Sequence, residues 1–91
     1  MIESVLEDLV RDKAEAAGWI VRKVRWIGRR NCMDRFFLKD GRIVLIEMKK
    51  PGEKPNPNQQ REIDLFIAAG AEVHVCDNHL AALRVLGVDY A

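Results

Sequence analysis

The sequence has few cysteines and no long apolar run. Its two cysteines, Cys32 and Cys76, lie far apart and form no CxxC pair, whereas disulfide scaffolds use more cysteines at closer spacing. No apolar run approaches the roughly 18 residues of a membrane span. The first ten residues, MIESVLEDLV, lack the basic start and apolar block of a signal peptide. These absences predict reduced thiols, no membrane segment and a cytoplasmic location.

Net charge is nearly absent as well, because 15 Lys and Arg residues offset 14 Asp and Glu residues. The overall charge therefore does not indicate a nucleic-acid binder, but its distribution is uneven. Residues 22–39 hold seven of the fifteen basic residues and a single acid. This region predicts a positive surface inside a neutral protein, although a solvated strand face would also explain a basic run.

Hydrophobic spacing predicts three helices and four strands within one domain, residues 1–91. Apolar residues recur at three- and four-residue steps over 2–17, which indicates a helix that ends at Gly18. Segments rich in β-branched and aromatic residues indicate strands. The resulting order, α-β-β-β-α-β-α, predicts an α/β (α+β-like) fold with a mixed sheet packed on helices. After the first helix, the predicted segments are strands at 19–27, 34–39 and 42–49, a helix from Asn56, a strand at 72–76 and a helix at 78–87.

A hairpin between the second and third strands brings two acids together. Asp40-Gly41 is the dipeptide favoured in two-residue type I′ turns, and such a turn makes the numbers of facing residues add to 81. Asp34 then faces Glu47, and Lys49 follows two residues later on the same side of the sheet. A shift of one residue in the register would move Asp34 to the other side.

Opposed carboxylates repel each other unless a cation lies between them. Hard oxygen ligands at this separation suit Mg²⁺ or Mn²⁺. Such an ion would polarise a phosphate and activate a water, while the Lys49 ammonium would orient that water or stabilise developing charge. The pattern thus predicts phosphodiester hydrolysis. A Glu-x-Lys pair on a solvated strand is, by contrast, often only a weak salt bridge.

Asp34, followed by IEMKKPGEKPNPNQ at residues 46–59, resembles the PD-(D/E)xK nuclease pattern and in particular its virus-type replication-repair subgroup, the VRR-NUC domain. The resemblance runs from Glu3 to about Asp77 and implies a restriction-endonuclease-like core. One departure is Asn31-Cys32-Met33-Asp34, where the family usually has Gly-x-Pro-Asp. Asparagine tolerates positive φ, so the turn can survive.

The resemblance implies that Asp34, Glu47 and the backbone carbonyl of Met48 hold Mg²⁺ or Mn²⁺, with Lys49 catalytic. A glutamate of the first helix, Glu3, would reach the metal directly or through water.

Two of the implied roles have alternatives nearby. Glu7 is the alternative to Glu3, but on a helical wheel Glu3 lies nearer the apolar stripe. A glutamine that opens the second helix completes the implied catalytic set, and its spacing to Gly70 favours Gln59 over Gln60. An Asn56-x-x-Gln59 capping box would also explain Gln59.

By resemblance, the protein is a metal-dependent endonuclease of phage or bacterial origin that acts in DNA repair. It would cut branched or four-way-junction (Holliday junction) DNA as a homodimer, with no organic cofactor. The alternatives are a non-catalytic DNA-binding module and a flap nuclease or exonuclease within a larger repair complex. Basic side chains would bind phosphates by shape and charge, and the candidates are Arg22, Arg25, Arg29, Arg30, Arg35 and Lys50.

Overall fold

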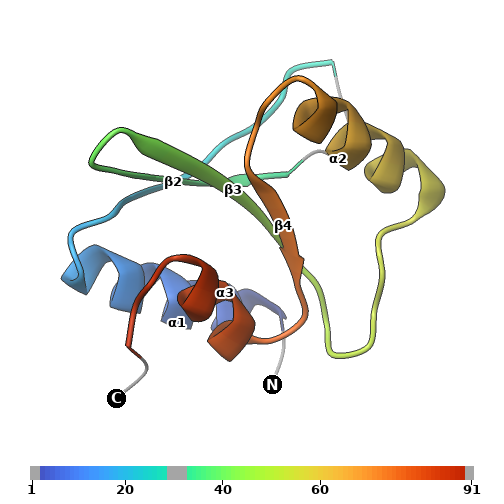
Figure 1. The fold of residues 1–91 in the computed structure, drawn as a ribbon. Coiled ribbons are helices and arrows are strands. Elements are labelled where there is room, and N and C mark those ends of the chain that lie inside the picture. Colours follow the sequence, from blue (N-terminus) through green and yellow to red (C-terminus); the bar gives the residue numbers. More distant parts are fainter. Residues whose placement is uncertain (1–2, 29–32, 90–91) are drawn as a thin grey trace.

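The computed structural model describes the backbone of residues 3–28 and 33–89, and the side chains of these residues from Val5 onward. The predicted order of elements is confirmed (Figure 1). In the described part, no helix is both long enough and apolar enough to cross a membrane. The elements are α1 (Glu3–Ala16), β1 (Ile20–Lys23), β2 (Arg35–Lys39), β3 (Arg42–Met48), α2 (Pro57–Ala68), β4 (Val73–Cys76) and α3 (His79–Val85).

The four strands form one mixed sheet in the order β1-β2-β3-β4. Strand β2 is antiparallel to both β1 and β3, and β4 adds parallel to β3 after the α2 crossover. The predicted hairpin register is confirmed, since Lys39 pairs with Arg42 and Arg35 with Ile46. Its turn residues Asp40 and Gly41 both have positive φ, 50° and 79°, as a type I′ turn requires.

The first strand is shorter than predicted. The sequence predicts a strand over 19–27, but β1 ends at Lys23. Trp26 instead leaves the sheet and packs edge-on against Phe66 of α2, with ring centroids 5.4 Å apart. This tertiary contact, and the hydrogen bond that its indole makes, outweigh the local strand propensity of the segment.

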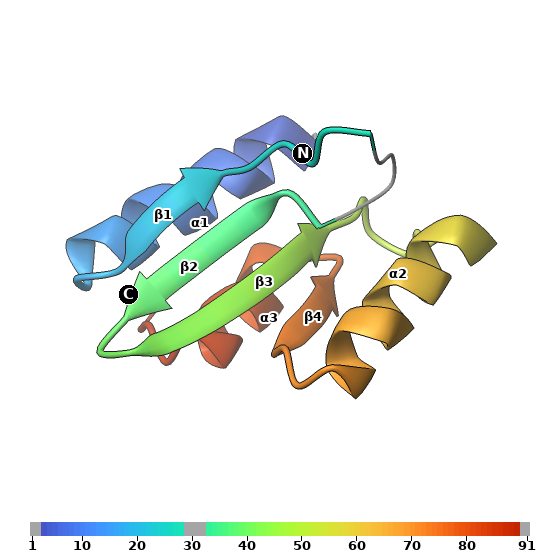
Figure 2. The ribbon, with the colours of Figure 1, turned by 90° about the horizontal axis from the view of Figure 1, so that it is seen from above.

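The helices cover the two faces of the sheet unequally. Helices α1 and α3 lie on one face, over the main core that contains Phe37, Val44 and Ile46. Helix α2 lies on the other side, next to β4, where Ile63 packs in a smaller cluster with Leu45. Seen from that side, β1, β2 and β3 are not covered by any helix (Figure 2). The α2 side of the sheet is therefore open toward a large ligand.

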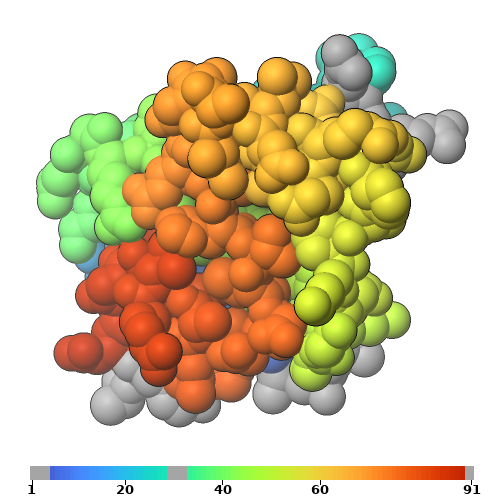
Figure 3. All heavy atoms as spheres, turned by 45° about the vertical axis from the view of Figure 1, so that its right-hand side comes forward, coloured from blue at the N-terminus to red at the C-terminus, as the bar shows by residue number. Residues whose placement is uncertain are grey.

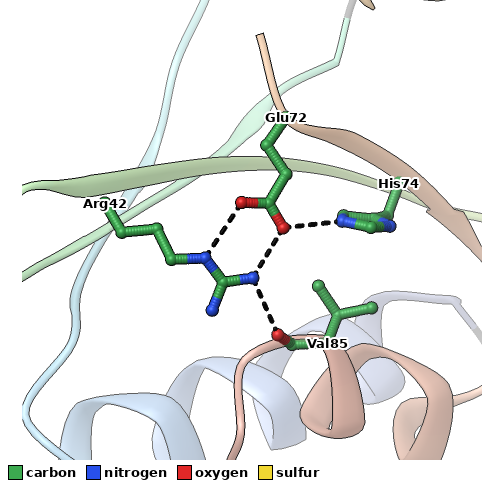
Figure 4. A network of polar contacts seen from close by, with 4 residues as sticks. All are labelled: Arg42, Glu72, His74 and Val85. Atoms are coloured by element: carbon green, nitrogen blue, oxygen red, sulfur yellow. Dashed lines mark hydrogen bonds and ion pairs between the residues drawn. The ribbon is translucent and has the colours of Figure 1, made fainter.

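A polar network ties the start of β3 to β4 and α3 (Figure 4). The Arg42 guanidinium donates to both carboxylate oxygens of Glu72, at 2.9 and 2.6 Å, and to the carbonyl oxygen of Val85 at 3.1 Å. His74 Nε2 lies 2.8 Å from the same carboxylate. Hydrogen bonding to Arg42, helped by His74, lowers the pKa of Glu72 from 4.5 to about 2.

This network predicts acid-sensitive stability. A carboxylate whose pKa is lower in the folded state stabilises the fold above its unfolded pKa, and that contribution is lost as the pH falls toward about 2. Glu72→Gln should lower the free energy of unfolding at pH 7 by about 1 kcal/mol, a small value because the pair is partly solvated. The difference in free energy of unfolding between the wild type and Glu72→Gln should become smaller between about pH 4.5 and 2 in urea titrations. Glu15→Gln, at an exposed helix position, serves as control, and a deficit independent of pH would contradict this assignment.

Candidate active site

The candidate site lies where β2 begins and β3 ends. The last β2–β3 pair is Arg35 with Ile46, so the next pair outward places Asp34 opposite Glu47. The Val24 amide donates to the Asp34 carbonyl oxygen at 2.7 Å, which holds the Asp34 backbone in line with β1. Alternation along the strands puts the Asp34 and Glu47 side chains on the open, α2 side of the sheet.

Lys49 joins Glu47 from just beyond the end of β3. Its Nζ lies 3.4 Å from Glu47 Oε2 and 3.9 Å from Glu53 Oε1. The residue is only 8% exposed, and its amide donates to the Cys76 carbonyl oxygen of β4 at 2.8 Å. A lysine this buried is rare in small proteins unless it is paired. The structure therefore fixes an ammonium beside a carboxylate at the end of β3.

The donor set at this edge suits a hard divalent cation. The donors that the sequence reading assigns to this edge are the carboxylates of Asp34 and Glu47 and the backbone carbonyl of Met48, which are all oxygen atoms. No group of three His, Cys, Asp or Glu residues that could hold a metal occurs in the described part of the chain. Mg²⁺ and Mn²⁺ accept such a sparse set, because they retain waters and bind through one or two carboxylates plus phosphate. The residues present fit such an ion.

Helix α1 carries the two candidate glutamates, Glu3 and Glu7. The Glu3 side chain lies outside the described residues, so its role remains a prediction. Glu7 is engaged elsewhere: its Oε2 accepts a hydrogen bond from Arg35 at 3.0 Å, and both side chains are 10% exposed. This pair lies between α1 and the sheet, on the face opposite to Asp34.

The placement of Arg35 requires a correction. The sequence predicts that it binds phosphate, but it is 8% exposed and its nearest charged partner is Glu7. The physical reason is strand alternation, because Arg35 follows Asp34 directly and so points to the covered face of the sheet. Its Nε is buried and has no hydrogen-bond partner. Arg35 is therefore a structural residue under the site and is not available to DNA.

The two candidate glutamines differ in their contacts. Gln59 forms the capping box of α2 with Asn56. The backbone N–H of Gln59 donates to Asn56 Oδ1 at 2.9 Å, and the side-chain Oε1 of Gln59 accepts from the backbone N–H of Asn56 at 3.0 Å. Gln60 is exposed and donates to Asp64. Helix α2 thus holds Gln59, half-buried, in a fixed position. Its catalytic role remains a prediction beside this capping role.

The basic candidates outside the core are partly described. Arg22, Arg25 and Lys50 are exposed, while Arg29 and Arg30 lie outside the described residues. Lys23, which the sequence reading left out, is also exposed at the end of β1. Lys23 belongs to the basic run at residues 22–39, so the sequence already indicates that it could bind phosphate.

Sequence reading also missed what Trp26 does near the site. Its Nε1 donates to the carbonyl oxygen of Met33, next to Asp34, at 2.6 Å. The need of a partly buried indole N–H for an acceptor was the available signal.

Comparisons with known proteins agree with this fold. No family model matches the chain. Over 77 residues the chain is 38% identical to the protein named "Putative nuclease p44" of Acyrthosiphon pisum secondary endosymbiont phage 1, and the match covers 84% of this chain and 83% of that one. A solved structure described as "VRR_NUC domain" superposes with a TM-score of 0.85 at 30% identity. That match covers 98% of this chain and 97% of the other.

Proposed function

This chain belongs to the VRR-NUC family of nuclease domains, and we propose that it is a divalent-metal-dependent endonuclease that cuts branched DNA as a homodimer. The observation that carries the proposal is the group of Asp34, Glu47 and the buried Lys49 at one open edge of the sheet. Burying an ammonium costs free energy, and its place beside Glu47 suits a group that stabilises charge developing on a reacting phosphate.

Each residue has a distinct task in this proposal. Asp34, Glu47 and the Met48 carbonyl would hold Mg²⁺ or Mn²⁺, with Glu3 as a further ligand, directly or through water. When bound, the ion supplies Lewis-acid activation of the scissile phosphate and of a water.

Lys49 and Gln59 would act on the reacting groups. The Lys49 ammonium stabilises negative charge that develops on the phosphate and orients the attacking water. Gln59 uses its Oε1 in the helix cap, so its amide N–H groups are the part that would donate to substrate.

DNA would approach along the open side of the sheet. Exposed basic side chains near this end of the sheet would neutralise phosphates without reading sequence, which predicts strong salt dependence of binding. Symmetrical cuts in a branched substrate need two active sites, so the proposal includes a homodimer. The proposed phosphate-binding residues are Arg22, Arg25, Arg29, Arg30 and Lys50.

The test is cleavage of a labelled four-way junction, a flap and a linear duplex, each with Mg²⁺, Mn²⁺ or EDTA. We expect cutting only with metal, fastest on the junction, and lost in Asp34→Asn because that change removes a charged ligand. Salt-sensitive binding without cutting under any condition would instead identify a DNA-binding module. Preference for the flap would move the assignment to flap processing. Sedimentation at micromolar concentration should give a dimer, and a single species at the monomer mass of 10.4 kDa would contradict that part.

A further inference from the structure

Ile27 is the most exposed large apolar side chain in the described part of the chain. It is 96% exposed, and the next highest value is 63%, for Leu65. Single exposed apolar residues are ordinary on protein surfaces, so the surroundings of Ile27 decide whether it has a role. Burial of such a side chain against a partner would be favourable.

The segment that carries Ile27 is attached beside the candidate active site. Immediately before it, Trp26 donates to the Met33 carbonyl oxygen at 2.6 Å and packs edge-on against Phe66 of α2. Two residues earlier, the Val24 amide bonds to the carbonyl oxygen of Asp34 at 2.7 Å. Both hydrogen bonds are made to the two residues that directly precede β2. Ile27 therefore directly follows a segment that hydrogen bonds hold against Met33 and Asp34, and Asp34 is a proposed metal ligand.

The shape of the molecule agrees with this placement. The blue-green segment that follows β1 stands above the sheet on the same side as α2 (Figure 1). In the space-filling view its atoms lie at the upper edge of the molecule, beyond α2 (Figure 3). A substrate that reaches Asp34 from the open side of the sheet would pass this projection.

The charge around Ile27 selects the kind of partner. Residues 19–33 contain no Asp or Glu, and Arg22, Lys23 and Arg25 are exposed on the same segment. An exposed apolar side chain that follows exposed basic residues in the chain matches nucleic acid, where phosphates flank an apolar base stack. DNA-distorting proteins insert Ile, Leu, Phe or Met between base steps in this way. Insertion costs least where stacking is already interrupted, as at a branch point or a mismatch.

We propose that Ile27 is a wedge that packs against the exposed base pair at a DNA branch point and so favours branched over linear DNA. This inference rests on the proposed nuclease function and specifies how its substrate is chosen. Trp26 is then the positioning residue, because its hydrogen bond and ring contact fix the base of the wedge.

The first test measures base stacking without cleavage. The protein used is the Asp34→Asn variant. Two DNA substrates carry the fluorescent adenine analogue 2-aminopurine: a four-way junction with the analogue at the branch point, and a linear duplex with the analogue at the same base step of the sequence. Binding should raise fluorescence in the junction, because Ile27 unstacks the base. The rise should be lost in Ile27→Ala and kept in Ile27→Phe. It should also be kept in Ile43→Ala, an isoleucine that is 50% exposed at the hairpin end of β3, four residues from Glu47.

The second test compares cleavage rates with metal present. Ile27→Ala should lower the ratio of junction to linear-duplex cleavage by about tenfold, and Ile43→Ala should leave that ratio as in the wild type. An unchanged ratio and unchanged fluorescence in Ile27→Ala would overturn the wedge while leaving the nuclease function intact. Wild-type protein that cuts no DNA with either metal would instead overturn the proposed function.

Discussion

Lys49→Met should reduce DNA cleavage by at least about a hundredfold. The expected loss follows from removing a positive charge fixed next to the reacting phosphate, a change that typically costs a factor of 10²–10³ in enzymes. The side chain lies at 3.4 Å from Glu47 and is nearly buried, so no solvent cation can replace it in the same position. Single-turnover cleavage of the junction at saturating metal measures the effect directly.

Stability measurements separate a catalytic role from a structural one. A buried ion pair is often no more stabilising than apolar side chains of similar size, so the double variant Glu47→Leu/Lys49→Met should unfold at the same or a higher urea concentration than the wild type. Lys54→Met, at an exposed position in the same loop, is the matched control and should cut normally. A Lys49→Met variant that cuts at the wild-type rate would remove Lys49 from the mechanism. A large loss of stability in the double variant would make the pair structural.

The part of the site that could be predicted from the sequence depends on local rules. Asp40-Gly41 favours a single turn type, and the two-residue period of a strand then sets which side chains face each other. These two rules place Asp34 opposite Glu47 and put Lys49 on the same side, with no knowledge of the rest of the chain. The Asn56–Gln59 capping box follows from an equally local pattern and is confirmed.

The parts that could not be predicted depend on contacts between distant segments. Trp26 has high strand propensity, but its place is decided by Phe66, forty residues later. Arg35 belongs to a basic run, and this run predicts a place on the surface. Its buried position depends on Glu7, which lies 28 residues away in α1. The two-residue period of a strand places Arg35 on the same face as Phe37, so the sequence pattern already indicates that Arg35 faces the core.

Arg35→Met should destabilise the fold by about 3–5 kcal/mol, because it leaves the Glu7 carboxylate buried without its partner. Both side chains are 10% exposed and joined at 3.0 Å, so water cannot easily compensate. A loss of this size is a large share of the stability of a small domain. Urea titration at pH 7 measures it, and Arg11→Met, which breaks only exposed ion pairs with Asp8 and Asp12, should cost less than about 1 kcal/mol.

The double variant Glu7→Leu/Arg35→Met tests whether the cost arises from the unpaired charge. Replacing both partners with apolar side chains removes the buried charges together, so most of the stability lost in Arg35→Met should return. The double variant also removes the Arg35 Nε, which is buried without a hydrogen-bond partner, and with it the cost of burying that atom. If the double variant is as unstable as the single one, the shape of the guanidinium, and not its charge, holds α1 on the sheet. The cleavage rate of the folded double variant shows what else the buried pair does. A wild-type rate would mean that the pair beneath Asp34 matters only for folding, and a lower rate would mean that it also holds the geometry of the site.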